Sequence, residues 1–134
     1  MKELALMASD EALYTVLDAI RDALSEHGWE DEPTTQILIS AEEIFVNIAH
    51  YAYGGESKEA WVKIDADENR CILEFRDKGK PYNPLLKEDP DITLSADERE
   101  IGGLGIFMVK EFMDREDYRF EDGQNIFTVE KKRP

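Results

Sequence analysis

The chain has 134 residues, of which 42% are hydrophobic and 35% are charged. This length suits one domain with its own hydrophobic core and is too short for two ordinary domains, so we expect residues 1–134 to fold as one unit. Acidic residues outnumber basic ones 31 to 16, and the net charge of −15 disfavours nonspecific binding to nucleic acids and anionic membranes. The charge would suit a partner with a basic surface, or it serves only to keep the protein soluble.

Cysteine usage and hydropathy both favour the cytoplasm. The single cysteine, Cys71, cannot form a disulfide within the chain, and its alternating neighbours predict a buried position in a strand. No apolar run is long enough to cross a bilayer, and the first residues do not read as a signal peptide. Two histidines, His27 and His50, are too few to suggest a zinc site.

The N-terminal part reads as a short strand followed by two helices. Residues 4–7 fit a strand, and residues 9–28 have a capping serine, helical apolar spacing and a terminal glycine. A second helix is expected from Pro33 to residue 53, before two consecutive glycines. Its apolar residues cover almost the whole circumference, which predicts a buried helix.

Polar residues on this buried helix require an explanation. Glu43 and Asn47 are four residues apart and therefore share one face. They could form a hydrogen bond within the helix, face solvent, or take part in a functional site. The residues alone leave these alternatives open.

A β-hairpin is expected next. Residues 60–67 and 70–77 alternate apolar and polar side chains, and Glu68-Asn69 between them suits a turn. Residues 85–100 lack periodicity, and a loop of this length is usually either functional, often a lid, or disordered.

Three glycines, Gly102, Gly103 and Gly105, introduce a helical apolar pattern. The first N–H groups of a helix lack partners and lie at the positive end of its dipole, so such a turn can hold a phosphate. The alternative is a tight connection where the helix packs close to a neighbour. Two strands are expected at residues 118–120 and 125–130, and the charged tail, 131–134, is expected to fray.

The chain thus contains three motifs in this order: Glu43-x-x-x-Asn47, Asp77-x-Gly79 and Gly102-Gly103-x-Gly105. Together they resemble the N, G1 and G2 boxes of the GHKL, or Bergerat-fold, ATPases, over about residues 9 to 130. Within that family the chain is most similar to the anti-sigma factor serine kinases, through Glu43-Ile44-Phe45-Val46-Asn47 and Gly79-Lys80-Pro81-Tyr82-Asn83-Pro84. The resemblance implies an α+β fold, a two-layer α/β sandwich whose mixed, mostly antiparallel sheet is covered on one face by helices.

The resemblance also implies an ATP-Mg²⁺ site. Asp77 would accept a hydrogen bond from the exocyclic amine of adenine, and Gly79 would let the base approach the backbone. Asn47 would be an oxygen ligand of Mg²⁺. Glu43 would accept the proton of the attacking hydroxyl group.

Further contacts are implied for the phosphates and the base. Backbone N–H groups of Gly103, Leu104 and Gly105 would bind the phosphates, and an ATP lid would span about residues 85–102. Within that lid Arg99 would replace an arginine that the family places just before the glycines. Either Asn125 or Thr128 would lie near adenine, where relatives often have a threonine.

The function implied is that of a regulatory serine/threonine protein kinase, which phosphorylates a small antagonist protein, sequesters a sigma factor, or does both. The alternative is a nucleotide-dependent protein-interaction module without phosphoryl transfer. A detached catalytic domain of a histidine kinase is a third interpretation. A homodimer is suggested by the resemblance alone.

Overall fold

The computed structural model describes residues 1–54, 56–86 and 103–134. The elements, in chain order, are β1 (Lys2–Met7), α1 (Asp10–Glu26), α2 (Asp31–Asn47), a π-helix (Ile48–Ala52), β2 (Glu59–Ala66), β3 (Arg70–Asp77), a 3-10 helix (Pro84–Leu86), α3 (Gly103–Phe112), β4 (Arg115–Glu121) and β5 (Gln124–Lys132).

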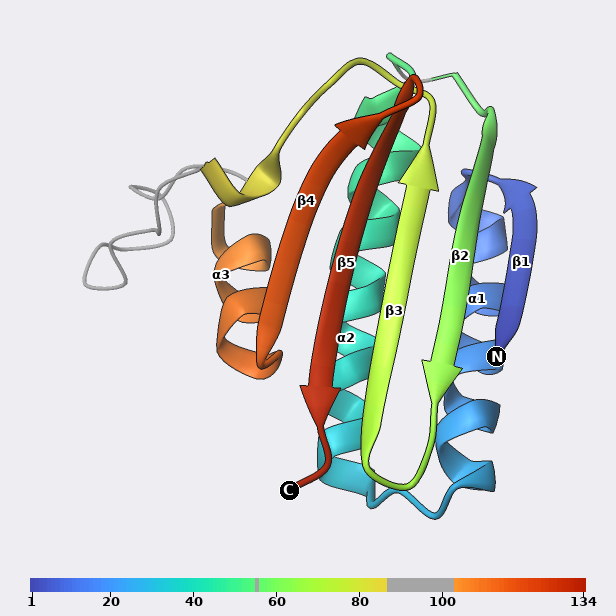
Figure 1. The fold of residues 1–134 in the computed structure, drawn as a ribbon. Coiled ribbons are helices and arrows are strands. Elements are labelled where there is room, and N and C mark those ends of the chain that lie inside the picture. Colours follow the sequence, from blue (N-terminus) through green and yellow to red (C-terminus); the bar gives the residue numbers. More distant parts are fainter. Residues whose placement is uncertain (55, 87–102) are drawn as a thin grey trace.

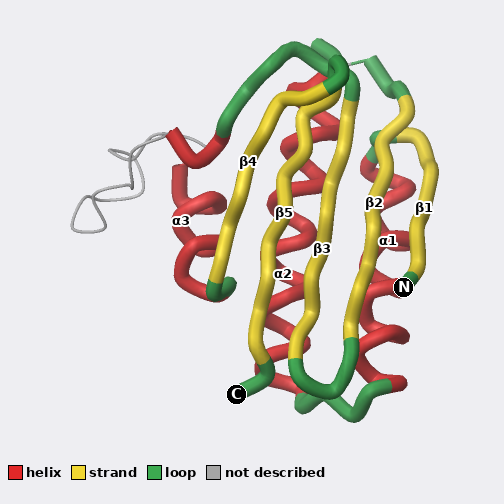
Figure 2. The backbone as a smooth tube through the Cα atoms, in the orientation of Figure 1, coloured by secondary structure: helices red, strands yellow, loops and turns green. Residues whose placement is uncertain are grey.

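The five strands form one sheet in the order β1-β2-β3-β5-β4. All four pairings are antiparallel, whereas the prediction allowed for a mixed sheet. The three α-helices lie on one face of the sheet, which leaves the other face uncovered by any described helix (Figure 1, Figure 2). The predicted α+β class and the hairpin of β2 and β3 are confirmed. None of the helices in the described part of the chain has the length and apolar character to cross a membrane.

The core lies between the sheet and the helices. In β2 and β3 every second side chain is buried, as the alternating sequence predicts, and Val62 pairs with Phe75 beneath α2. Phe45 of α2 and Ile20 of α1 are fully buried, and burial of each such side chain stabilises the fold by about 1.5–3 kcal/mol. Cys71 is buried in β3, and desolvation raises the pKa of its thiol to about 12.

Both long helices follow their predicted bounds with two differences. One is that α2 ends at Asn47 rather than near residue 53, and a π-helix, Ile48–Ala52, covers the rest of the predicted span. The Ser9 hydroxyl accepts a hydrogen bond from the Ala12 N–H at 3.2 Å and caps α1, and Gly28 follows this helix with φ +73°. The second helix begins at Asp31 rather than Pro33, since the first turn of a helix tolerates proline at more than one position.

The C-terminal tail does not fray, so that prediction is wrong. The Lys131 ammonium is buried and donates to the Phe112 carbonyl at 2.7 Å, and β5 extends to Lys132. Arg133 then reaches across to two turns. Charged residues at a chain end suggested solvent exposure, but here the Lys131 and Arg133 cations each have backbone acceptors.

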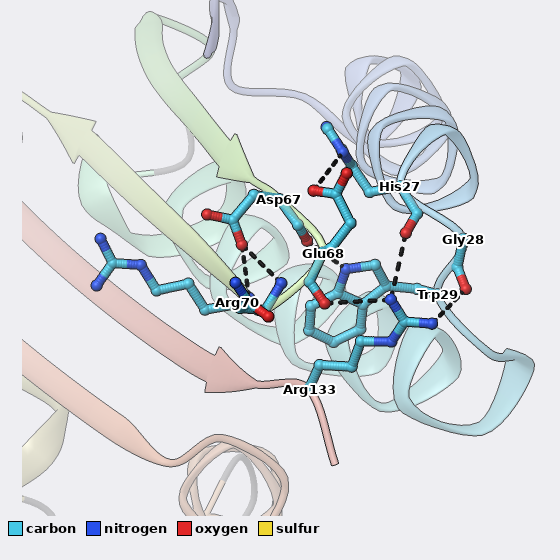
Figure 3. A network of polar contacts seen from close by, with 8 residues as sticks. His27, Gly28, Trp29, Asp67, Glu68, Arg70 and Arg133 are labelled. Atoms are coloured by element: carbon cyan, nitrogen blue, oxygen red, sulfur yellow. Dashed lines mark hydrogen bonds and ion pairs between the residues drawn. The ribbon is translucent and has the colours of Figure 1, made fainter.

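The contacts of Arg133 join the α1–α2 turn to the β2–β3 turn (Figure 3). Its guanidinium donates to the carbonyls of Gly28 at 2.8 Å and Glu68 at 3.1 Å, and to the Glu30 carboxylate at 2.8 Å. A longer bond reaches the His27 carbonyl at 3.4 Å. We call this group of residues the Arg133 end of the sheet.

Candidate functional site

A cavity of about 770 Å³ lies at the opposite end of the sheet. Its walls come from the end of α2, the π-helix, β3 and the loop after it, the adjoining strands β4 and β5, and α3. This volume is in the range of small-molecule sites. We call this region the cavity end.

Asp77 is the last residue of β3, and it lines the cavity although it is only 5% exposed. Its Oδ1 atom accepts hydrogen bonds from the Gly79 N–H and from the Asn125 side-chain amide, both at 2.9 Å. Among the described residues, no donor reaches its second oxygen, Oδ2. A buried carboxylate therefore has an acceptor to offer to a ligand that carries N–H groups.

Strand register decides between Asn125 and Thr128 as the neighbour of Asp77. Asn125 is paired with Asp77, whereas Thr128 is paired with Glu74 and Asp117. Because successive side chains alternate between faces, Thr128 lies on the face of the sheet without helices. Asn125 lines the cavity and Thr128 does not.

Packing within the protein requires a glycine at position 79. A β-carbon at this position would lie 2.1 Å from the Ala52 carbonyl oxygen and 2.6 Å from the Ala52 carbonyl carbon. The loop after β3 therefore packs directly against the backbone of the π-helix. The sequence suggested that Gly79 makes room for a base, and the structure reveals this second requirement.

Glu43 and Asn47 do form the hydrogen bond within the helix that was one of the alternatives. The Asn47 amide donates to Glu43 Oε1 at 3.2 Å, which leaves the Asn47 carbonyl oxygen available. Asn47 lines the cavity, while Glu43 lies one turn earlier, outside its lining. The bond orients Asn47, and it does not exclude a role in ligand binding.

Gly105 brings α3 close to Glu43. A β-carbon at Gly105 would lie 1.9 Å from the Glu43 carboxyl carbon. The tight packing that was one explanation for the glycines is therefore confirmed at Gly105. The phosphate explanation stays a prediction, based on the N–H groups of the first turn of a helix, which lack partners within the helix. Gly103, Leu104 and Gly105 are the first three residues of α3. Gly102, Arg99 and nearly all of the predicted lid lie outside the described residues.

Several cavity residues were not predicted as part of a site. They are His50, Tyr51, Lys80, Tyr82 and Tyr118. The first four stand beside the motifs and could have been found by extending them along the chain. Tyr118 has no such signal, because only the pairing of β4 with β5 brings it to the cavity.

The family is shown by comparison with known proteins. A family model described as the histidine kinase-like ATPase domain matches residues 6–131. The protein therefore belongs to this family of ATPase domains, as the GHKL resemblance predicted, and the family implies that the chain binds a nucleotide.

One curated relative gives a more specific comparison. The chain is similar to the serine/threonine-protein kinase BtrW of Bordetella bronchiseptica, with 25% identity over 126 residues. The alignment covers 93% of this chain and 85% of the relative. Family and relative together support an ATP-binding, kinase-like regulatory role.

Proposed function

We propose that the protein is an ATP-Mg²⁺-dependent regulatory serine/threonine protein kinase of the anti-sigma type. It would act in the cytoplasm, phosphorylate a small antagonist protein, sequester a sigma factor, or do both, and thereby regulate transcription. The observation that carries the proposal is the buried carboxylate of Asp77, with an acceptor left over, in a cavity that Asn47 also lines. A second copy of the chain is a further candidate partner.

In this proposal adenine binds beside Asp77. The Asp77 carboxylate accepts the exocyclic amine, and a purine with a carbonyl at that position would bring one acceptor against another. The phosphates bind at the first turn of α3, through the N–H groups of Gly103, Leu104 and Gly105. Arg99 supplies a further positive charge to them.

Asn47 is the proposed ligand of Mg²⁺. Its amide group is already held by Glu43, so its carbonyl oxygen is the group that is available to a cation. Within the described ranges there is no cluster of three or more His, Cys, Asp or Glu residues that could hold a metal. This fits Mg²⁺, which keeps several waters and takes further ligands from phosphates, and which would neutralise charge on them when bound.

Glu43 is the proposed base. The oxygen of the partner's serine hydroxyl attacks the γ-phosphorus of ATP, the bond from that phosphorus to the β,γ-bridging oxygen breaks, and ADP leaves. The hydroxyl proton passes to the Glu43 carboxylate. The 3.2 Å bond from Asn47 would hold this carboxylate near the phosphate end of the site.

A nucleotide-dependent interaction module is the second candidate. It is favoured by the two contacts of Glu43, with Asn47 and against Gly105, which give this carboxylate a structural role without any proton transfer. In that case ATP would control the binding of a protein, and no phosphoryl group would be transferred.

Calorimetric titration and phosphoryl transfer test both candidates. We expect the wild type to bind ATP and ADP but not GTP, and to transfer label from γ-labelled ATP to an antagonist-like protein encoded beside its gene. Glu43→Gln should bind ATP and lose transfer, while Glu42→Gln, a change at the exposed neighbouring residue, should keep both. ATP binding without transfer by the wild type would favour the interaction module. Absence of binding to any adenine nucleotide would reject both candidates.

A further inference from the structure

A hydrogen-bond network behind Asp77 has no role in the function proposed above. Asn125 Oδ1 accepts from the Tyr118 hydroxyl and, at 3.1 Å, from the Tyr82 N–H. The same N–H lies 3.2 Å from the Tyr118 hydroxyl. Tyr118 of β4 and Tyr82 of the loop after β3 thus both donate to Oδ1 of Asn125 in β5.

These two donors determine which way the Asn125 amide points. Its Nδ2 atom lies 2.9 Å from Asp77 Oδ1, and it also faces the carbonyls of Lys80 at 3.0 Å and Gly79 at 3.4 Å. A flipped amide would place its oxygen against these acceptors and its NH₂ group against the Tyr82 N–H. Only the observed orientation satisfies all of these groups.

The orientation of Asn125 in turn fixes Asp77. With Asn125 and the Gly79 N–H on Oδ1, the carboxylate is held by one of its two oxygens. Rotation of the carboxylate would break both bonds, and one of their donors, Asn125, is only 7% exposed. Oδ2 is therefore the acceptor that remains for a ligand in the cavity.

We propose that Tyr118 and Asn125 are positioning residues that set the selectivity of this cavity for purines with an exocyclic amine at carbon 6. This inference rests on the proposed binding of ATP. Tyr118 acts through Asn125, and Asn125 acts through Asp77. A 6-oxo purine presents a carbonyl to the fixed Oδ2 atom and is rejected, because neither acceptor can turn away.

The test compares ATP with inosine triphosphate, which has a carbonyl in place of the 6-amino group, by calorimetric titration of the full chain. We expect Tyr118→Phe to lower the affinity for ATP about tenfold, as for one hydrogen bond in a charged network, and to leave that for inosine triphosphate unchanged. The selectivity ratio should therefore fall about tenfold. Asn125→Leu should lower it further.

A matched control is Tyr14→Phe, since Tyr14 lies on α1 and is 71% exposed. It should change neither affinity. Tyr118→Phe removes a single oxygen atom, so it keeps the test informative if Asn125→Leu does not fold. The melting temperature of each variant checks folding.

The outcomes separate the inference from the function on which it rests. An unchanged ratio in Tyr118→Phe, or an equal loss for both nucleotides, would overturn the positioning role while ATP binding by the wild type stands. Wild type that binds neither nucleotide would overturn the proposed function together with the inference.

Discussion

At the Arg133 end of the sheet, each strong donor meets an acceptor from the protein. The Arg133 guanidinium donates to backbone carbonyls of two turns and to Glu30, and the backbone N–H of Arg133 donates to the Asn69 carbonyl at 2.8 Å. Close by, the Trp29 indole N–H donates to the Asp67 carbonyl at 2.7 Å. These bonds join segments that are far apart in the sequence, and they hold the turns in place.

At the cavity end, polar side chains are only partly hydrogen-bonded within the protein. Asp77 and Asn47 each use one polar atom within the protein and keep another for the cavity. These spare acceptors belong to residues that line the cavity, where the proposed nucleotide would supply donors. From this contrast we expect substitutions at the Arg133 end to change mainly stability, and substitutions of polar side chains at the cavity end to change mainly nucleotide binding.

The largest expected effect is on binding. Asp77→Asn should lower the affinity for ATP about 10- to 150-fold, because a hydrogen bond to a charged group is worth about 1.5–3 kcal/mol. The new side chain can still accept from Gly79 and Asn125 through its oxygen, and its NH₂ group then faces the cavity. Inosine triphosphate should therefore bind more tightly to Asp77→Asn than to the wild type.

Titration with both nucleotides measures this change. Asp65→Asn, at an exposed position of β2, is the control and should leave both affinities unchanged. Unaltered affinity of Asp77→Asn for ATP would contradict the assignment of Asp77 to the base.

Gly79→Ala should affect both stability and nucleotide binding, because the loop after β3 borders the cavity and packs against the π-helix. The added β-carbon would lie 2.1 Å from the Ala52 carbonyl oxygen, and the two backbones must separate. We expect a loss of about 1–3 kcal/mol in the free energy of unfolding, typical of overpacking, and weaker ATP binding.

Thermal denaturation with and without ATP measures both effects. Gly28→Ala is the control, because Gly28 lies at the Arg133 end and outside the cavity lining, with φ +73° and open space around it, so its substitution reports backbone strain alone. A Gly79→Ala variant as stable as the wild type would show that the loop and the π-helix separate easily.

Arg133→Ala should lower stability and leave ATP affinity unchanged. It removes the donors that bridge the α1–α2 and β2–β3 turns, so we expect the melting temperature to fall by a few degrees. Arg133→Lys should not restore it, because an ammonium group cannot bond to all of these acceptors at once. Arg21→Ala, which breaks an exposed pair with Asp18, should change little. Weaker ATP binding by Arg133→Ala would contradict the proposal that the Arg133 end contributes to stability and not to nucleotide binding.

The smallest expected effect is a response of the Arg133 end to acid. The hydrogen bond from Arg133 holds the pKa of Glu30 below its ordinary value of 4.5, and backbone N–H groups, first that of Asn69, lower the pKa of Asp67. A lowered pKa in the folded state means that the unfolded state binds more protons. This stability is present above the ordinary pKa and is lost as the pH falls through the folded one.

We therefore expect the difference in melting temperature between wild type and Arg133→Ala to shrink when the pH is lowered from about 7 to about 3. Part of the difference should remain, since the carbonyl acceptors of Arg133 do not titrate. A constant difference over this range would mean that the Glu30 contact contributes nothing.

Local patterns were sufficient to predict most of the fold. Alternation in residues 60–77 predicted the hairpin, and helical spacing with a serine cap predicted α1. The three motifs also led to Asn47 and Asp77, which do line one cavity. These predictions depend on residues close together in the sequence, where spacing and turn chemistry determine the geometry.

The remaining features depend on contacts between distant segments. Tyr118 reaches Asn125 only because β4 and β5 pair in one register, and Gly79 meets Ala52 only once the π-helix has formed. The tail was predicted to fray because its charges suggested exposure to solvent, and the carbonyls that accept from the Arg133 guanidinium come from turns 65 to 106 residues earlier. No local pattern carries such information.

The two glycines in the first turn of α3 have a consequence for the local stability of that helix. Gly103 and Gly105 each disfavour helix by about 0.5–1 kcal/mol relative to alanine, so this turn should open independently of the rest of the fold. A nucleotide that bonds to its N–H groups would close it, and part of the binding energy would be used for local folding. Amide hydrogen exchange at residues 103–106 would then slow on addition of ATP, while exchange in β3 would change little.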